Sequence, residues 1–227
     1  LSNDPSSSSS TATFQQSSGN ATIAGVISGS SANISKIGSG NLTLSGANTY
    51  QGTTTVAEGT LTVTTNDGLG TADGGTIVQD GATLAFDGPS ITIGDAISVA
   101  GSGANGAGAL RVESGSTSLD GLVTLTGDTA IFLQTGQLLI SEITGDHNLT
   151  LTGGAGGASA RFRSDLGIGT GNLTLNNINV GMDAANSFTG DVFLNSSGLD
   201  LAANGADTIN DLARVTLART GIPAARL

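Results

Sequence analysis

Few residues in this chain are of the types that carry out catalysis or bind metals. The 227 residues include one histidine, His147, and no cysteine. A serine–histidine–acid triad needs its histidine beside a serine and a carboxylate, and Asp146 is only a sequence neighbour of His147. These counts exclude thiolate metal sites, disulfides and zinc sites with several histidines. We expect His147 to be an exposed turn residue.

The acidic residues do not form an obvious catalytic pair. Asp80, Asp87 and Asp95 recur every seven or eight residues, which places successive carboxylates on different sides of a chain that turns often. A glycosidase needs two carboxylates about 5–9.5 Å apart, so turn formation is the better explanation. The run Arg161–Phe162–Arg163 puts two arginines on one side of a strand, as a surface pair or, alternatively, a ligand contact. We predict no catalytic, cofactor-binding or metal-binding residue and no enzymatic activity.

The net charge of −11 argues against nucleic acid as a partner. Lys36 is the only lysine among seven basic residues, whereas nucleic-acid binding relies on lysine and arginine to neutralise phosphates. No apolar run approaches the roughly 18 residues of a membrane helix, so we expect no membrane span in this segment.

The elements that would position any site are short strands. Apolar residues alternate with threonine or serine at period 2, which is typical of half-buried strands. Gly makes up 36 residues and interrupts any helical pattern. Asp-Gly dipeptides punctuate the strands, and we expect their glycines to adopt positive φ in tight turns. The clearest strands are 41–44, 60–63, 82–86, 90–93, 96–99, 123–125, 130–133, 148–151 and 172–175, and the dipeptides start at Asp67, Asp73, Asp80, Asp87 and Asp120.

The sequence also repeats internally. Residues 38–44 match residues 169–175, and residues 47–52 match 185–190. The spacing differs between the two matches because seven residues, about one strand and a turn, are inserted within 176–184. Solenoids tolerate such insertions. We therefore predict an all-β, three-sided parallel β-helix with about 20–24 residues per coil, about ten rungs and a length of about 50 Å at about 4.8 Å per coil.

The matching corner residues Asn48 and Asn186 are candidates for hydrogen-bonded side-chain ladders between stacked coils. The two glycine-rich stretches, 101–108 and 153–157, are predicted loops, because neither is followed by a helix with a lysine that could hold phosphate. Residues 207–217 give the best helical pattern, but the alternation in 214–217 favours another corner and strand.

Residues 36–63 resemble the autotransporter-associated β-strand repeat of bacterial passenger domains. Gly, Asn, Tyr and Val occur at the spacing of that repeat, and the 169–201 copy is a degenerate version with Phe188 in place of tyrosine. The resemblance implies a right-handed parallel β-helix, secretion and display at the cell surface. It implies no catalytic activity, cofactor or metal.

We expect a Ser-rich leader at 1–18, one β-helix domain at 19–218, and a tail or cap at 219–227. The expected function is that of a non-enzymatic extracellular structural protein, a stiff spacer or filament segment at a bacterial surface. Its expected partners are further copies of itself, joined head to tail, or neighbouring segments of a longer passenger. The alternative is an adhesin that binds host or matrix glycans through the glycine-rich loops. A polysaccharide-degrading enzyme on the same fold is the third interpretation.

Overall fold

The computed structural model describes residues 10–154, 156–184, 186–200 and 215–218, and this part of the chain is almost entirely β-structure. Strands account for 58% of the residues, and one 3-10 turn, η1 (Ala104–Gly106), interrupts them. The strands are β1 (Ser10–Gln15), β2 (Asn20–Ile23), β3 (Ser28–Gly29), β4 (Ala32–Ile37), β5 (Asn41–Leu44), β6 (Thr49–Tyr50), β7 (Thr54–Val56), β8 (Gly59–Val63), β9 (Thr76–Val78), β10 (Ala82–Ile93), β11 (Ile97–Gly101), β12 (Leu110–Leu133), β13 (Gln137–Thr144), β14 (Leu149–Gly153), β15 (Ser159–Phe162), β16 (Leu166–Gly167), β17 (Leu173–Asn176), β18 (Asn179–Met182), β19 (Val192–Asn195), β20 (Gly198–Asp200) and β21 (Val215–Ala218).

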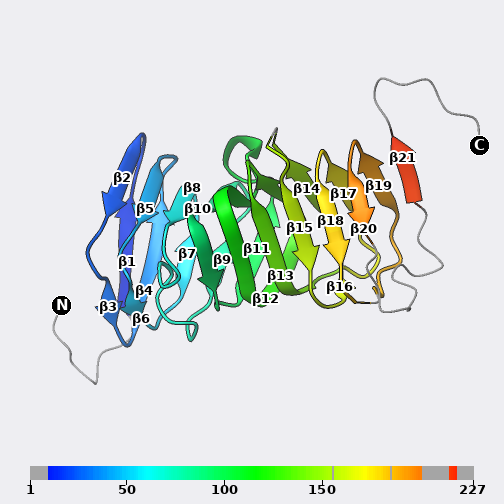
Figure 1. The fold of residues 1–227 in the computed structure, drawn as a ribbon. Helices are drawn as coiled ribbons and strands as arrows, with labels where there is room; N and C mark the ends of the chain where they lie inside the picture. Colours follow the sequence, from blue (N-terminus) through cyan, green and yellow to red (C-terminus); the bar gives the residue numbers. More distant parts are fainter. Residues whose placement is uncertain (1–9, 155, 185, 201–214, 219–227) are drawn as a thin grey trace, which may run out of the picture.

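The chain winds as a parallel β-solenoid of about nine turns (Figure 1). Each strand pairs in parallel with the strand one coil away, as β5 does with β2 and β8. Leu42 pairs with Leu61 after 19 residues, and Leu84 pairs with Leu110 after 26. The longer coil contains the predicted loop at 101–108, which adds residues without disturbing the register. The parallel β-helix is thus confirmed, with about nine turns where we expected about ten.

Three columns of strands form the sides of the solenoid, because residues of the same inward position stack above one another. In each column the inward position is mostly aliphatic, and alternate residues face outward. One column stacks Ala21, Leu42, Leu61, Leu84, Leu110, Ile131, Leu151, Leu175 and Leu194; the second stacks Ile34, Thr54, Thr76, Ile97, Val123, Ile143 and Leu166; the third stacks Ile91, Thr117, Leu138, Ala160, Val180 and Leu199.

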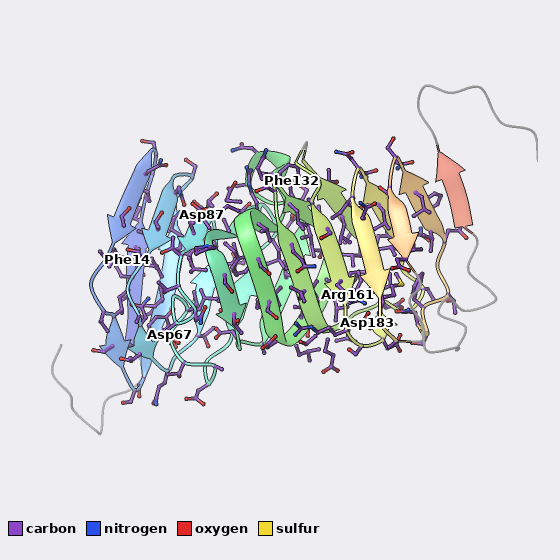
Figure 2. All side chains as sticks on the ribbon, viewed as in Figure 1. Phe14, Asp67, Asp87, Phe132, Arg161 and Asp183 are labelled. Carbon is purple, nitrogen blue, oxygen red and sulfur yellow. The ribbon has the colours of Figure 1, made fainter. Side chains whose placement is uncertain are left out.

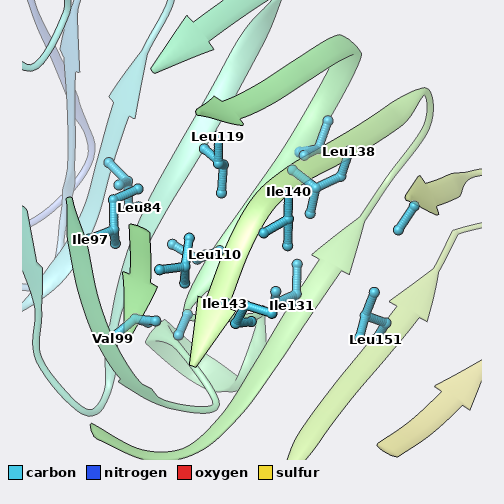
Figure 3. Close-up of a cluster of buried hydrophobic side chains, with 14 of the residues drawn as sticks. Leu84, Ile97, Val99, Leu110, Leu119, Ile131, Leu138, Ile140, Ile143 and Leu151 are labelled. Atoms are coloured by element: carbon cyan, nitrogen blue, oxygen red, sulfur yellow. The ribbon is translucent and has the colours of Figure 1, made fainter. Parts of the chain in front are cut away.

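The core is one continuous apolar column along the solenoid axis. Figure 3 shows Leu84 from the first column beside Ile97 from the second, and Ile131 from the first beside Ile143 from the second. These side chains are at most 2% exposed. Full burial of one leucine or isoleucine contributes about 1.5–3 kcal/mol. The interior is narrow, so stacked aliphatic side chains fill it with only a few aromatic rings.

Most glycines of the Asp-Gly dipeptides do not adopt the positive φ that we predicted for them. Of their five glycines only Gly81 has positive φ. A Cβ at Gly74 or Gly121 would overlap a backbone carbonyl of the preceding coil. Those two glycines are therefore required by close coil-to-coil approach rather than by a left-handed backbone. The strands β10 and β12 also continue round two corners, at Asp87–Gly88 and Asp120–Gly121, where the pairing register shifts.

The inserted unit of the second repeat copy is a strand, as predicted. Residues 176–184 contain β18, which pairs with β15 and β20 in the third column. The corresponding part of the first copy runs from β5 to β6 without a strand of that column. The second coil is nevertheless no longer than the first, because Leu173 pairs with Val192 after 19 residues, just as Leu42 pairs with Leu61 after 19.

The first strand lies within the segment that we expected to be a leader. β1 pairs in parallel with β4, so the solenoid already includes residue 10, and residues 1–9 lie outside the described part. At the other end β21 pairs with β19, which confirms the strand favoured at 214–217; the remainder of 207–217 and the expected tail at 219–227 are not described. Among the described residues no helix is long and apolar enough to cross a membrane.

Candidate functional site

The most unusual buried feature is a polar cluster that spans three coils. Thr54 and Thr76 occupy successive inward positions of the second column, where the neighbours are aliphatic. The Tyr50 hydroxyl lies 2.6 Å from Thr54 Oγ1, and Thr76 Oγ1 donates to Asp95 Oδ2 at 2.9 Å. Asp95 is 4% exposed and Tyr50 is fully buried. Desolvation raises the pKa of Asp95 to about 6, although the hydrogen bond from Thr76 acts in the opposite direction.

Asp95 lies at the bend between β10 and β11, as a turn residue would, but its side chain is buried rather than exposed. The alternation Ile91, Ile93, Asp95, Ile97 places Asp95 on the inward face, so the signal was present in the period-2 pattern. Asp80 and Asp87 are exposed at the surface, as turn residues would be. The three carboxylates thus do not converge on one site.

Lys36, the only lysine, is buried and closes one corner of the solenoid. Its Nζ donates to the carbonyls of Gly38 at 2.6 Å, Glu58 at 3.0 Å and Ile37 at 3.2 Å. Burial lowers the pKa of Lys36, while the negative charge of Glu58 raises it. The ammonium group has three donors and here satisfies three backbone acceptors, which makes it a structural group rather than a free cation.

Side chains also connect successive coils at a second corner. Asp128 Oδ1 accepts from the backbone N–H of Asn148 at 2.9 Å, Asn148 Oδ1 accepts from that of Asn172 at 2.8 Å, and Asn172 Oδ1 accepts from that of Asp191 at 2.7 Å. We call Asp128, Asn148, Asn172 and Asp191 the Asx row. Each link joins residues 19 to 24 positions apart, which is one coil.

The two corner asparagines of the sequence repeat bind backbone rather than each other. Asn48 Oδ1 accepts from Ile27 N–H at 2.8 Å, and Asn186 Oδ1 accepts from Leu166 N–H at 2.8 Å. Both side chains are buried, and both bonds reach back one coil. The prediction of inter-coil bonding is confirmed at these positions. In the Asx row one further bond joins two side chains directly, because Asn148 Nδ2 donates to Asp128 Oδ2 at 2.8 Å.

The two arginines at 161 and 163 form ion pairs on the outside of the third column (Figure 2). Arg161 Nε donates to both carboxylate oxygens of Asp183, at 2.7 and 2.9 Å. Arg163 Nη1 lies 3.4 Å from Asp120 Oδ1. The Asp183 carboxylate raises the pKa of Arg161, and the Arg161 hydrogen bonds lower the pKa of Asp183. These contacts favour the surface-pair interpretation.

His147 is partly exposed near two carboxylates. Its Nδ1 lies 4.0 Å from Asp128 Oδ1, and its side chain is 39% exposed. Hydrogen bonds from Asn148 lower the pKa of Asp128, and those from Thr170 lower the pKa of Asp146. In the described ranges no three histidine, aspartate or glutamate side chains are grouped closely enough to hold a metal ion.

Two hollows lie on the outer faces. One, of about 310 Å³, is lined by residues of β13, β15, β18 and β20 and includes Arg161 and Asp200. The other, of about 400 Å³, lies beside the Asx row and reaches Gly101 and Ser102 at one end and Phe193 at the other. The second hollow thus involves one of the glycine-rich loops that an adhesin was expected to use.

Comparison with known proteins identifies one repeat within this solenoid. Residues 34–63 match the family model described as passenger-associated-transport-repeat. No curated protein and no solved structure matches the chain. The matched stretch runs from β4 through β8 and contains Lys36, Asn48 and Tyr50, whose buried contacts are described above. It coincides with the stretch that resembles the autotransporter-associated repeat, so that resemblance is confirmed. Residues 34–63 therefore carry a passenger-associated-transport repeat of the autotransporter passenger type, and they span more than one coil of a parallel β-solenoid, since β4 stacks on β7 and β5 on β8.

Proposed function

We propose that this chain is a non-enzymatic, stiff β-helical spacer within a secreted or surface-displayed bacterial passenger. The repeat at 34–63 belongs to a family associated with passengers, which supports a location outside the cell. The observation that carries the spacer function is the coil-to-coil connection. Backbone ladders, the Asx row and the Lys36 corner all bond along the axis of the solenoid.

Such a rod resists bending because strand ladders join each coil to its neighbours, on two sides throughout and on the third side from β10 onward. Every strand ladder runs along the axis, and the apolar column has no break between Leu42 and Val192. In a solenoid the stability of each coil depends on its neighbours, so opening one coil breaks its contacts with both adjacent coils. A spacer needs this property, since its task is to keep two ends at a fixed separation.

Stiffness can be tested by measuring the distance across the rod. The chain has no cysteine, so Thr22→Cys and Asn195→Cys introduce a unique pair for spin labels. Thr22 and Asn195 lie in one outward row, roughly eight coil steps apart, which predicts a separation of about 40 Å at about 4.8 Å per step. Pulsed electron paramagnetic resonance should give one narrow distance distribution. A broad or multiple distribution would contradict the spacer proposal.

Head-to-tail assembly belongs to the same proposal. Among the described residues β1, β2 and β3 each pair with a strand on one side only. A strand edge with unpaired backbone groups can template another strand, and asymmetric contacts that do not close give filaments. Phe14, Ile23 and Ile27 are only partly buried in the first coil, and Val26 is 62% exposed. Sedimentation velocity should show concentration-dependent assembly and negative-stain images should show rods longer than one chain. Monomers alone across a wide concentration range would contradict assembly without affecting the spacer test.

A further inference from the structure

The hollow beside the Asx row extends along the solenoid axis over several coils. Its floor consists of outward residues of β12, β14 and β17, namely Ala130, Thr150 and Thr174, which pair in register. Asp128, Asn148 and Asn172 form one side. Gly101 and Ser102 close one end, where the chain enters the loop that contains η1. We call this feature the Asx groove.

The Asx groove presents polar groups that the protein itself does not use. The side-chain oxygens of Asn148 and Asn172 each accept a backbone N–H, which fixes the amides. Asn148 Nδ2 also donates one proton to Asp128 Oδ2 at 2.8 Å, so one amino proton of Asn148 and those of Asn172 are left for a ligand. Within the described residues the hydroxyls of Thr150 and Thr174 and the amino group of Asn172 have no hydrogen-bond partner. Hydroxyls both donate and accept. The groove therefore offers both donors and acceptors along its length.

An aromatic ring lies at the far end of the groove. Phe193 pairs with Thr174 and Thr216 in register, so it occupies an outward position in a row otherwise formed by Ala130 and threonines. It is partly exposed and lines the hollow. A phenylalanine on the outer face of a solenoid contributes little to the core, and exposed aromatic surface beside polar groups is typical of binding sites.

The charges around the groove limit what it can bind. Asp128 lines it, Asp146 and His147 lie close by, and none of the lining residues is lysine or arginine. Phosphates, sulfates and uronic acids would meet a carboxylate without a cation to offset it, and the whole chain carries −11. A neutral ligand with many hydroxyl groups and an apolar face is compatible with every group in the groove.

We propose that the Asx groove binds a neutral oligosaccharide that lies parallel to the solenoid axis. One sugar ring stacks on Phe193, and successive rings place their hydroxyls on Thr174, Thr150 and the amides of Asn172 and Asn148. Coils repeat at about 4.8 Å, close to the advance of one ring in an extended sugar chain, so each ring meets an equivalent set of groups. This inference goes beyond the spacer function and does not depend on it.

The test measures binding of defined hexasaccharides to the full chain by isothermal titration calorimetry. The probes are the neutral hexasaccharides of β-1,4-glucose, β-1,3-glucose and β-1,4-N-acetylglucosamine, with hexagalacturonate as the anionic counterpart. We expect at least one neutral probe to bind and the anionic probe to fail. Phe193→Ala should weaken binding at least about tenfold, as expected for an aromatic anchor.

A blocked groove and a matched control separate this site from the rest of the surface. Thr174→Arg fills the groove, whereas Thr43→Arg makes the same change at the equivalent position of the first Gly-x-Gly-Asn-Leu-Thr-Leu copy, outside the groove. Loss of binding in Thr174→Arg with retention in Thr43→Arg supports the proposal. Failure of all three neutral probes to bind, preference for hexagalacturonate, or equal effects of the two arginine variants would overturn it. Circular dichroism verifies that each variant is folded.

Discussion

Replacement of Asp95 by asparagine should stabilise this protein at neutral pH. Asp95 is 4% exposed, accepts a hydrogen bond from Thr76, and lies near Tyr50, the other titratable side chain in the cluster. No cation forms an ion pair with Asp95 among the described residues. Asparagine keeps the shape and the acceptor for Thr76 but removes the buried negative charge.

The magnitude follows from the pKa of Asp95. That pKa is 3.8 for an ordinary aspartate and about 6 in the fold, and each pKa unit corresponds to about 1.36 kcal/mol. Well below pH 3.8 the carboxyl is protonated in both the folded and the unfolded state, so it does not affect the unfolding free energy. Between pH 3.8 and 6 the unfolded chain releases the proton first, so stability falls as the pH rises. At pH 7 the buried charge of Asp95 therefore lowers the unfolding free energy by about 3 kcal/mol, and Asp95→Asn should restore that amount.

Urea unfolding followed by circular dichroism at several pH values provides the assay. The difference in unfolding free energy between Asp95→Asn and the wild type should be near zero at pH 3.5 and grow to about 3 kcal/mol at pH 7, or about 6–12 °C in Tm for a chain of this size. Asp87→Asn changes the net charge equally at an exposed position and is the control. A pH-independent difference, or an Asp95→Asn variant less stable than wild type at pH 7, would refute the reasoning.

Three further changes test the packing and are each measured by urea unfolding. Thr117→Val should raise the unfolding free energy by about 1 kcal/mol, because the buried Thr117 hydroxyl has no hydrogen-bond partner among the described residues and lies in an apolar column. A loss of stability would show that the hydroxyl is bonded. Lys36→Ala should lower the unfolding free energy by about 3 kcal/mol, since three carbonyls lose their hydrogen-bond donor. A decrease below about 1 kcal/mol would mean that water replaces the ammonium group. Gly52→Ala should lower the unfolding free energy by about 2 kcal/mol, because its Cβ would overlap a carbonyl of the preceding coil. Gly25→Ala is the control and should change the unfolding free energy by less than about 0.5 kcal/mol, because a Cβ there faces open space. Similar effects of the two glycine variants would contradict the close approach of the coils.

The sequence was sufficient to predict the fold because its information is local and repeated. Alternation at period 2 assigned the inward face of segments such as Asn41–Leu44, and the match between 38–44 and 169–175 gave the repeat. A parallel pairing then follows, since copies of one short strand can be stacked only by a coil that returns in the same direction. The same alternation places Asp95 on the inward face, and the structure shows that it lies at a bend and is buried there.

What only the tertiary structure decided is how residues one or more coils apart meet. The separations of 19 to 26 residues between stacked positions vary from coil to coil, so sequence spacing cannot show that Asp128, Asn148 and Asn172 share a corner or that Phe193 ends the groove beside them. Likewise, the sequence does not show that Lys36 is buried. Only the structure places three carbonyl acceptors around its ammonium group. A local pattern fixes which face a side chain takes, whereas its neighbours along the axis depend on the length of every intervening turn.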